Sequence, residues 1–446
     1  MPMKKILSML LICLLLTGCG AQKAAEPTVP EPASITEVLL SDDGIRVNGG
    51  AETSAVFTTH DIIYYEDRET YESGNPYGEG TAEEQHSAEE AAAHTVVNIT
   101  RPGTYRVSGS LSKGQIRIDL GEDTRKDPDA LVNLILSDAH ITCSVAPAIL
   151  FRNVYECDKD RDEDNATPEV DTADAGANLI LEGKNTISGS HVAKIFKDKD
   201  GEKKLWKQDS AIYSYRSMNV SGTGSMELTA DNEGMGTEMH LTINGGDIAI
   251  YSGNDGINTN EDGVSVTTIN GGNVTIFAGL GAEGDGIDSN GYLVINGGTV
   301  ISSANPKSDE GLDSVLGSYV NGGTVVAMGS TMNWAESDSD QVTMNLQFAS
   351  QQTPGSKITI TKEDGTEIFS FENKVAHARS FSGLILSHPD LTQGETYLIY
   401  VDGQQMVYTS NDVGQGHRND ESGEAQSSFY MNDKVNAFSG VRAIEE

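Results

Sequence analysis

The sequence predicts an all-β fold made of stacked coils, a β-solenoid, and three observations lead to this prediction. Each repeat combines an Asn-Gly-Gly corner with a short β-branched run such as Asn273-Val-Thr-Ile. Glycine is abundant (48 residues) while proline is scarce (12), so the glycines mark regular corners and not disorder. Helical or leucine-rich repeats would show Leu at fixed helical offsets, and none appear. The corners recur at intervals of 26, 26 and 25 residues, with Asn at 244, 270, 296 and 321.

The N-terminus is predicted to be a targeting segment. Lys4 and Lys5 precede an apolar run that closes on Leu-Thr-Gly-Cys19, which is a signal peptide too short to remain as a membrane span. Leu-Thr-Gly-Cys resembles the bacterial lipobox, and this resemblance implies lipidation of Cys19 and a place on the outer face of the cytoplasmic membrane. Residues 1–19 are therefore excluded from the fold, and residues 20–38, with three prolines, are predicted to be a tether.

The remaining chain divides into four predicted parts. An N-terminal segment, 39–94, carries a helix-like stretch at 79–92 that would cap the solenoid, which spans 95–335. Acidic and basic insertions at 156–175 and 191–209 are expected to loop out from coil corners. Asp-Gly turns between alternating strands then predict a C-terminal β module at 336–410, followed by a polar, partly disordered tail at 411–446.

The charge balance restricts the partners of the chain. With 67 acidic residues against 30 Lys and Arg, the formal net charge is −37. Nucleic acid and anionic surfaces would be repelled unless cations intervene, so membrane contact is expected only through the lipid anchor. Once Cys13 leaves with the signal peptide and Cys19 is lipidated, Cys143 and Cys157 remain, and nothing in the sequence fixes whether they pair.

A second recurring element predicts a calcium site. Three corners have an acid-Gly-Ile or acid-Gly-Leu core, as in Asn254-Asp-Gly-Ile-Asn. Stacking would place carboxylates of successive coils about 4.8 Å apart, and residues 240–330 hold ten carboxylates against one basic residue, Lys307. Oxygen ligands at such spacing suit calcium, although Asp and Asn also serve simply to make turns. The predicted ligands are Asp255, Asn258, Glu283, Asp285, Asp288, Asp309, Glu310 and Asp313.

Three further features have competing interpretations. The recurrent Asn residues are expected to form a buried, hydrogen-bonded ladder. Residues 158–169 place acids in an EF-hand-like register but lack the Gly of position 6, where Glu163 stands, so a solvated acidic loop is the preferred reading. Tyr251 and Phe277 occupy equivalent outward positions; they would either stack against sugar rings or pack beneath an insertion or the C-terminal module.

In these motifs the chain resembles a known family, the clostridial carbohydrate-binding β-helix lipoproteins that bind cellulose and acidic sugars. The resemblance covers roughly Thr95 to Tyr408 and rests on Gly103-Thr-Tyr-Arg-Val-Ser-Gly-Ser-Leu, the Ile-Asn-Gly-Gly coils, the Asp-Gly-Ile segments and Leu391-Thr-Gln-Gly-Glu-Thr-Tyr. It implies a right-handed parallel β-helix of the pectate-lyase type, bound calcium, affinity for cellulose and polygalacturonate, and no established catalysis. The two insertions depart from the family pattern.

The function expected from these features is calcium-dependent, non-catalytic binding of cellulose or of acidic, pectin-type polysaccharide by a monomeric cell-surface lipoprotein. A calcium-dependent polysaccharide lyase is the enzymatic alternative. Such a lyase needs an Arg or Lys base beside the metal, and only Arg152 and Arg216 on earlier coils are candidates. A surface adhesin without sugar affinity is the third hypothesis.

Overall fold

The computed structural model describes residues 34–65, 86–197, 203–330, 333–372, 377–413, 417–420 and 424–444. The chain divides into two compact units, Met1–Ser34 and Ile35–Glu446, and all the elements below belong to the second. The signal peptide, Cys19 and most of the predicted tether lie outside the described residues. No helix among the described residues is both long and apolar enough to span a bilayer.

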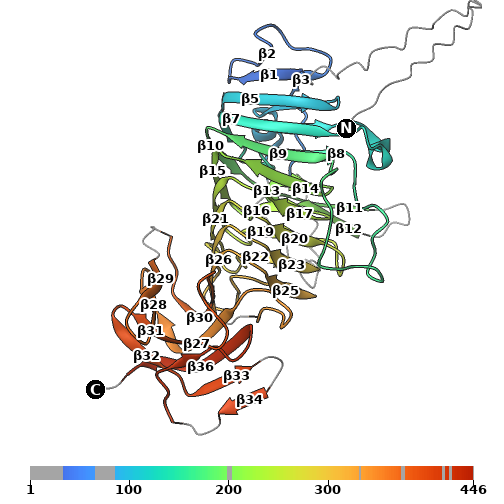
Figure 1. The fold of residues 1–446 in the computed structure, drawn as a ribbon. Helices are drawn as coiled ribbons and strands as arrows, with labels where there is room; N and C mark the ends of the chain where they lie inside the picture. The colour runs from blue at the N-terminus through green and yellow to red at the C-terminus, as the bar shows by residue number, and fades with distance from the viewer. Residues whose placement is uncertain are drawn as a thin grey trace, which may run out of the picture. The chain divides into compact units, whose positions relative to one another are not determined.

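The fold is all-β, and its main body consists of parallel ladders to which successive coils contribute one strand each (Figure 1). The chain visits the ladders in a fixed order, for example β14, β15 and β16 before β17, β18 and β19. The first ladder contains β5 (Gly103–Leu111), β7 (Val132–Thr142), β9 (Ala177–Glu182), β14 (Met218–Gly222), β17 (Leu241–Ile243), β20 (Val266–Ile269), β23 (Tyr292–Ile295) and β25 (Gly317–Val320).

The second ladder contains β10 (Lys184–Gly189), β15 (Ser225–Ala230), β18 (Asp247–Ser252), β21 (Asn273–Phe277), β24 (Thr299–Ser303) and β26 (Thr324–Gly329). The third contains β4 (Thr95–Ile99), β6 (Gly114–Asp119), β8 (Ile149–Asn153), β13 (Ser210–Ser214), β16 (Glu233–Thr237), β19 (Ile257–Thr259) and β22 (Ile287–Ser289).

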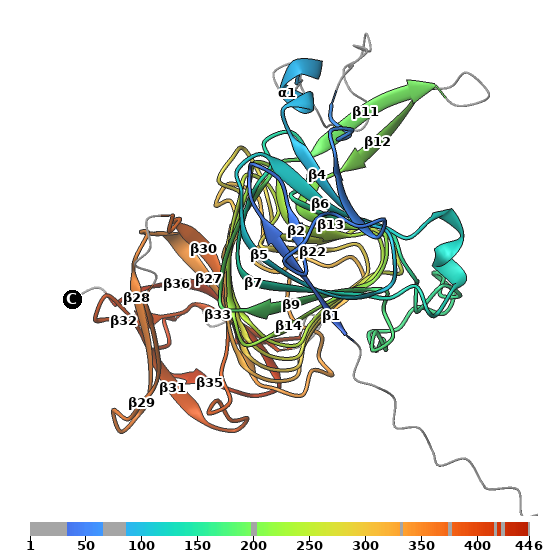
Figure 2. The ribbon, with the colours of Figure 1, turned by 90° about the horizontal axis from the view of Figure 1, so that it is seen from above.

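The core lies between the ladders and is built from equivalent positions of successive coils (Figure 2). Ile243, Ile269 and Ile295 are register partners in the first ladder, and each is at most 1% exposed. Side chains alternate between the two faces of a strand, so a coil-length register keeps apolar residues stacked inside and leaves their neighbours outside.

The N-terminal end of the ladders is covered by strands. β1 (Ile35–Leu40) pairs in parallel with β5 and antiparallel with β2 (Arg46–Val47), and β3 (Val56–Thr59) pairs antiparallel with β4. The strand begins at Ile35, so the last residues of the predicted tether belong to the sheet. The predicted helix is present only as α1 (Ala88–Ala92), capped by the Ser87 side chain, while residues 79–85 lie outside the described residues.

The C-terminal β module joins the last coil directly, because β30 (Phe381–Ser387) pairs antiparallel with both β26 and β27 (Thr343–Gln352). The tail differs from the prediction. β36 (Val435–Ala443) pairs in parallel with β27, and Phe438 and Val441 are buried in the core of the module. Its other strands are β28 (Lys357–Lys362), β29 (Glu367–Glu372), β31 (Thr396–Val401), β32 (Gln404–Val407), β33 (Ser410–Val413), β34 (His417–Asp420) and β35 (Phe429–Tyr430).

The two insertions have defined structures. The basic insertion forms an antiparallel hairpin of β11 (Val192–Lys197) and β12 (Lys203–Gln208), which projects from a corner of the coils in Figure 2. A short 3-10 helix, η2 (Glu122–Lys126), lies in an earlier loop. The acidic insertion crosses the first ladder and is described with the site.

Candidate functional site

The acidic corners of successive coils are stacked beside the third ladder. The amide of Gly256 donates to the carbonyl of Asp285 (3.0 Å), and the amide of Gly286 donates to that of Glu310 (2.9 Å), so these corners are in register. Asn258 and Asp288 are parallel partners in β19 and β22, and the bridge from Ile287 to Leu312 continues this register toward Asp313. The sequence prediction that these residues come together therefore holds for the column Asp255, Asp285 and Glu310 and the column Asn258, Asp288 and Asp313.

Some of the carboxylates also make turns, as the alternative interpretation proposed. Asp255 Oδ1 accepts from the amide of Asp285 (2.7 Å), and Asp285 Oδ1 accepts from the amide of Glu310 (2.5 Å). Asp309 Oδ2 accepts from the amide of Gly284 (3.0 Å). Each of these bonds holds one coil corner to the next, so the structural role and a ligand role fall on the same side chains.

The cluster is electrostatically strained. Burial, followed by the neighbouring charges of Glu233 and Asp288, raises the pKa of Asp255 well above its ordinary 3.8. Burial raises the pKa of Asp285 to about 7, with Asp313 and Asp288 as further causes, and burial together with Asp313 and Glu233 raises the pKa of Asp288 to about 7. Buried carboxylates close to one another cannot all ionise cheaply, so this cluster favours protons or a bound cation.

Glu233 lies in the column of Asp255, Asp285 and Glu310, one coil before Asp255. It is not among the ligands predicted from the sequence. It is 3% exposed, accepts from Ser210 Oγ (2.8 Å), and accepts from Asn258 Nδ2 (3.1 Å). Its corner reads Asn-Glu-Gly-Met, which has the same acid-Gly-apolar core as Asn254-Asp-Gly-Ile. Alignment of that weaker coil with the three clear ones would have found it.

The oxygen atoms around Asn258 fit a bound cation. Asn258 is 8% exposed, and its Oδ1 has no hydrogen-bond partner although Nδ2 donates to Glu233 and approaches Asp255 (3.4 Å). An orphaned buried oxygen among carboxylates fits a hard cation that prefers oxygen ligands. Glu283 is exposed and is not brought into the cluster. Among the described residues, no group of three or more His, Cys, Asp and Glu side chains is placed to hold a metal ion.

The acidic insertion does not form the EF-hand-like site. The guanidinium of Arg161 pairs with Asp158 (2.7 Å) and donates to the carbonyls of Thr167 (2.7 Å) and Glu169 (2.7 Å). Arg161 therefore occupies one carboxylate that an EF-hand-like site would need, and among the described residues no helix flanks 158–169, so the segment is not built as an EF-hand. The preferred interpretation, a solvated acidic loop, agrees with the exposed side chains of Asp160, Asp162, Glu163 and Asp164, while the start of the insertion is anchored to the coils.

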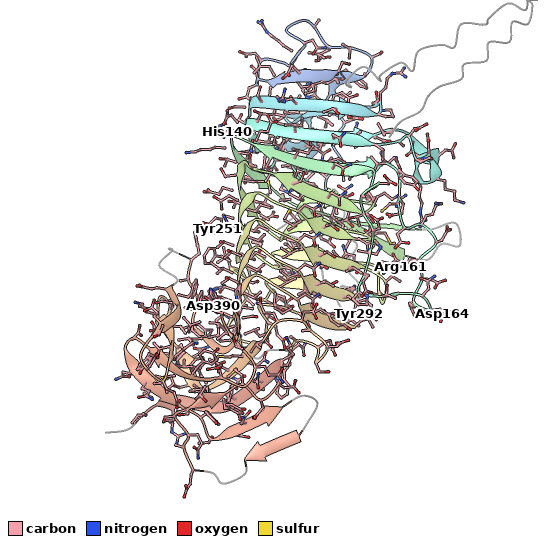
Figure 3. The ribbon with its side chains drawn as sticks, viewed as in Figure 1. His140, Arg161, Asp164, Tyr251, Tyr292 and Asp390 are labelled. Atoms are coloured by element: carbon pink, nitrogen blue, oxygen red, sulfur yellow. The ribbon has the colours of Figure 1, made fainter. Side chains whose placement is uncertain are left out.

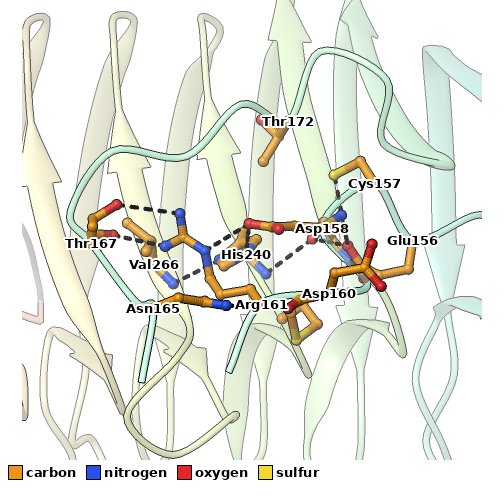
Figure 4. Close-up of polar contacts among 12 residues, drawn as sticks. Glu156, Cys157, Asp158, Asp160, Arg161, Asn165, Thr167, Thr172, His240 and Val266 are labelled. Carbon is orange, nitrogen blue, oxygen red and sulfur yellow. Dashed lines mark hydrogen bonds and ion pairs between the residues drawn. The ribbon is translucent and has the colours of Figure 1, made fainter. Parts of the chain in front are cut away.

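The anchor is shown in Figure 4. Glu156 is fully buried and accepts from the amide (2.9 Å) and hydroxyl (2.7 Å) of Ser217. Asp158 Oδ2 lies 3.3 Å from Nε2 of the buried His240, whose Nδ1 accepts from the amide of Val266 (3.0 Å). The geometry at Nε2 does not make a hydrogen bond, so the contact between the His240 ring and the Asp158 carboxylate is electrostatic. His240 and then Arg161 lower the pKa of Asp158 despite its partial burial.

The Asn ladder is present but exposed. Asn270 Nδ2 donates to Asn244 Oδ1 (2.8 Å), Asn296 to Asn270 (2.9 Å), and Asn321 to Asn296 (3.0 Å). The prediction of hydrogen bonding is confirmed, while the prediction of burial is wrong, because these side chains face outward beside the acidic insertion.

The aromatic pair requires a correction. Tyr251 and Phe277 stack with ring centroids 5.4 Å apart, but Phe277 is only 1% exposed, and Tyr251 is covered edge-on by His377 of the C-terminal module (5.0 Å). Phe277 is therefore not available to a sugar ring, which contradicts the predicted exposed pair. Packing against each other and against His377 accounts for the positions of the two rings. Figure 3 shows Tyr251 on the side of the coils opposite Arg161 and Tyr292.

The two remaining cysteines are free thiols. Burial is the main cause that raises the pKa of both Cys143 and Cys157 to about 12. Cys143 is buried and Cys157 half-buried, their raised pKa values keep both thiols protonated, and the structure contains no disulfide between them.

The two arginines proposed as lyase bases stand apart from the acidic cluster. Arg152 pairs with Asp119 (3.4 Å), and Arg216 donates to the carbonyl of Tyr215 (2.5 Å). Burial and then Arg125 lower the pKa of Arg216, and the acids that act on it are Glu156 and Glu238, not those of the stacked corners.

Comparison with known proteins places the chain in a family. A carbohydrate-binding domain-containing protein of Acetivibrio thermocellus is 26% identical over 253 residues, which cover 56% of this chain and 66% of that protein, just under two thirds of its length. A solved polysaccharide lyase-like protein from C. thermocellum, in a gadolinium derivative, aligns with 65% of this chain and 93% of that one at 19% identity and a TM-score of 0.37. The family model for carbohydrate-binding domain-containing proteins matches residues 93–368, more than half of the sequence, and the chain belongs to that family.

Proposed function

We propose that this protein is a non-catalytic binder of polysaccharide that holds acidic, pectin-type chains through calcium, on a scaffold that is a right-handed parallel β-helix. The observation that carries the proposal is the buried acidic column, where Asp285 and Asp288 have pKa values raised to about 7 and Asn258 Oδ1 has no partner. Membership of a carbohydrate-binding family supports a sugar ligand for a surface of this kind.

Calcium is the cation best suited to this donor set, because every candidate ligand is an oxygen atom. Asp255, Asn258 and Asp288 would hold the ion, with Asp285, Asp313 and Glu233 completing the negative field. A bound calcium ion would neutralise the carboxylates and offer a site for the carboxylate of an acidic sugar. Since the ligands are not placed for an ion as they stand, side-chain rotation must accompany binding.

Export and anchoring are part of the same proposal. The lipobox-like Leu-Thr-Gly-Cys19 would attach the protein to the outer face of the membrane, where polysaccharide is accessible and calcium is plentiful. The proposed absence of catalysis is supported by the arrangement around the column, where neither candidate base, Arg152 or Arg216, pairs with the stacked acids.

The proposal is tested by titrating the purified protein with calcium chloride in a calorimeter and measuring retention by polygalacturonate in affinity electrophoresis, with calcium or with chelator. We expect calcium-dependent heat and retention that needs calcium. Asp255→Asn with Asp288→Asn should lose both, and Glu363→Gln with Glu367→Gln, an equal charge change on the exposed hairpin of β28 and β29, should lose neither.

Two results would overturn it. Unchanged retention in chelator, together with no heat at millimolar calcium, would remove the metal from the function. A steady rise in ultraviolet absorbance from unsaturated products during incubation with polygalacturonate would show that the protein is a lyase.

A further inference from the structure

A polar groove of about 660 Å³ lies between the acidic insertion and the outer face of the first ladder, well separated in its lining residues from the acidic column. One wall is the stretch 168–173 of the insertion. The far end is lined by Tyr319 and the acidic residues Asp338 and Asp340. Figure 3 shows the insertion, marked by Arg161 and Asp164, on the same side of the coils as Tyr292, whose ring lies 6.2 Å from that of Tyr319.

The floor of the groove is a regular row of side chains that are polar except for Val294. Successive register partners in the first ladder present one outward residue per coil, spaced by about 4.8 Å. The Asn ladder runs parallel to this row at the coil corners. The row consists of Asn178, Asn219, Thr242, Thr268, Val294 and Tyr319.

The ladder leaves regular hydrogen-bonding capacity unused. An amide side chain offers two N–H donors and two acceptor lone pairs. Asn270 and Asn296 each use one N–H donor and one acceptor lone pair in bonds to their neighbours. One N–H and one lone pair of each residue are left for a ligand in the groove that these residues line. Paired donors and acceptors that repeat along an axis match the hydroxyl groups of a linear sugar chain, and Tyr319 offers a ring at the end of the row.

The charge of the groove selects against acidic chains. Its lining contains Glu169, Asp171, Asp338 and Asp340 but no Lys, Arg or His. Anionic sugars would be repelled here, in contrast to the column, where calcium is proposed to receive them. We propose that this groove binds a single chain of neutral polysaccharide, lengthwise along the Asn ladder. The proposal rests on the proposed function only in taking the ligand to be polysaccharide, and it does not depend on calcium.

The wall is fixed well enough to act as part of a binding site. Thr172 Oγ1 donates to Asn219 Oδ1 (2.8 Å) and accepts from Thr242 Oγ1 (2.8 Å), and Asn219 Nδ2 donates to the Thr172 carbonyl (2.7 Å). Glu156 and Asp158 hold the start of the same insertion on Ser217 and His240 (Figure 4). Because the wall stands over the floor, a single chain fits the groove whereas a flat crystalline surface does not.

The test is calorimetric titration of the full protein in chelator with cellohexaose and xylohexaose, and with hexagalacturonate. We expect at least one neutral hexasaccharide to bind and hexagalacturonate to show no heat. Asn270→Leu and Tyr319→Ala should each weaken the neutral sugar about tenfold or more, and Tyr430→Ala, an exposed tyrosine of the C-terminal module, should leave its affinity unchanged. Thermal melting shows that each variant is folded.

Failure of this proposal is distinguishable from failure of the calcium proposal. If no neutral hexasaccharide binds, or if the groove variants bind as the native protein does, the groove is not the site, whatever calcium does. If Asp255→Asn with Asp288→Asn retains hexasaccharide binding while it loses polygalacturonate, the two sites are separate, as we propose. Loss of both ligands in that folded variant would contradict the independence of the groove.

The wall can be tested on its own. Glu156→Gln replaces a buried carboxylate that accepts from four donors, including the amide of Asp158 (3.0 Å) and the thiol of Cys157 (3.6 Å), and should loosen the insertion. We expect faster tryptic cleavage after Lys159 or Arg161 and weaker hexasaccharide binding, with melting of the coils little changed. Cleavage at the native rate would show that Glu156 does not position the wall.

Discussion

Replacing Asp285 and Asp288 together by asparagine should remove the part of the pH dependence of stability of the calcium-free protein that these two carboxyls contribute. Both carboxyls have pKa values raised to about 7, mainly by burial, from an ordinary 3.8. A carboxyl with a raised pKa in the folded state favours folding below pH 4, and that contribution is lost as the pH rises through 7. The melting temperature of the native protein in chelator should therefore fall between pH 4 and pH 8.

Calcium should reverse this fall in the native protein, because a bound ion replaces the protons that the cluster would otherwise take up. The asparagine variant should show a smaller fall in melting temperature with pH, since Asp255 still has a raised pKa, and no response to calcium. Glu363→Gln with Glu367→Gln serves as the control, since it removes the same charge from an exposed hairpin. A variant that melts with the native pH profile would mean that these carboxyls are not the groups that titrate.

Gly298→Ala should destabilise the stacked coils strongly, whereas Gly365→Ala should cost little. Both glycines have a positive φ, +81° and +87°. A Cβ at residue 298 would lie 2.5 Å from the carbonyl oxygen of Gly272 in the preceding coil, while a Cβ at residue 365 meets nothing within 4 Å. The backbone conformation costs both variants about 1–2 kcal/mol, and the clash should add about 1–3 kcal/mol at residue 298 alone.

Denaturant unfolding of the two variants measures this difference directly. Both variants have the same conformational cost, so the difference between their free energies of unfolding measures the effect of the close approach of successive coils. Equal destabilisation would show that the coils can separate at this corner without loss of stability.

The parts of the fold that could be predicted are those with a strong local period. Asn-Gly-Gly corners and β-branched runs identify the coils because each coil needs glycine where two backbones approach closely and apolar residues in register. The same residue types therefore recur at a fixed interval along the sequence. The acidic column followed from the same period, and Glu233 was missed where the corner is weaker.

The features that could not be predicted depend on contacts between distant residues. Glu156 meets Ser217 sixty-one residues later, and nothing near either residue shows that a buried carboxylate will hold the insertion. The tail was expected to be partly disordered because its composition is polar, yet β36 pairs with β27 about ninety residues earlier. Phe277 lies at an outward position by alternation and is nevertheless buried, since Tyr251 and His377 gather over that face.

The strands at the two ends of the ladders bear on self-association. An unpaired edge of a parallel sheet is a template on which another copy can add its own strand, and copies joined in this way would grow into fibres. Here β1 pairs with β5 at one end and β30 pairs antiparallel with β26 at the other, which uses the backbone groups that a neighbour would need. The first strand of one ladder and the last strand of another are therefore closed to strand addition by a second copy.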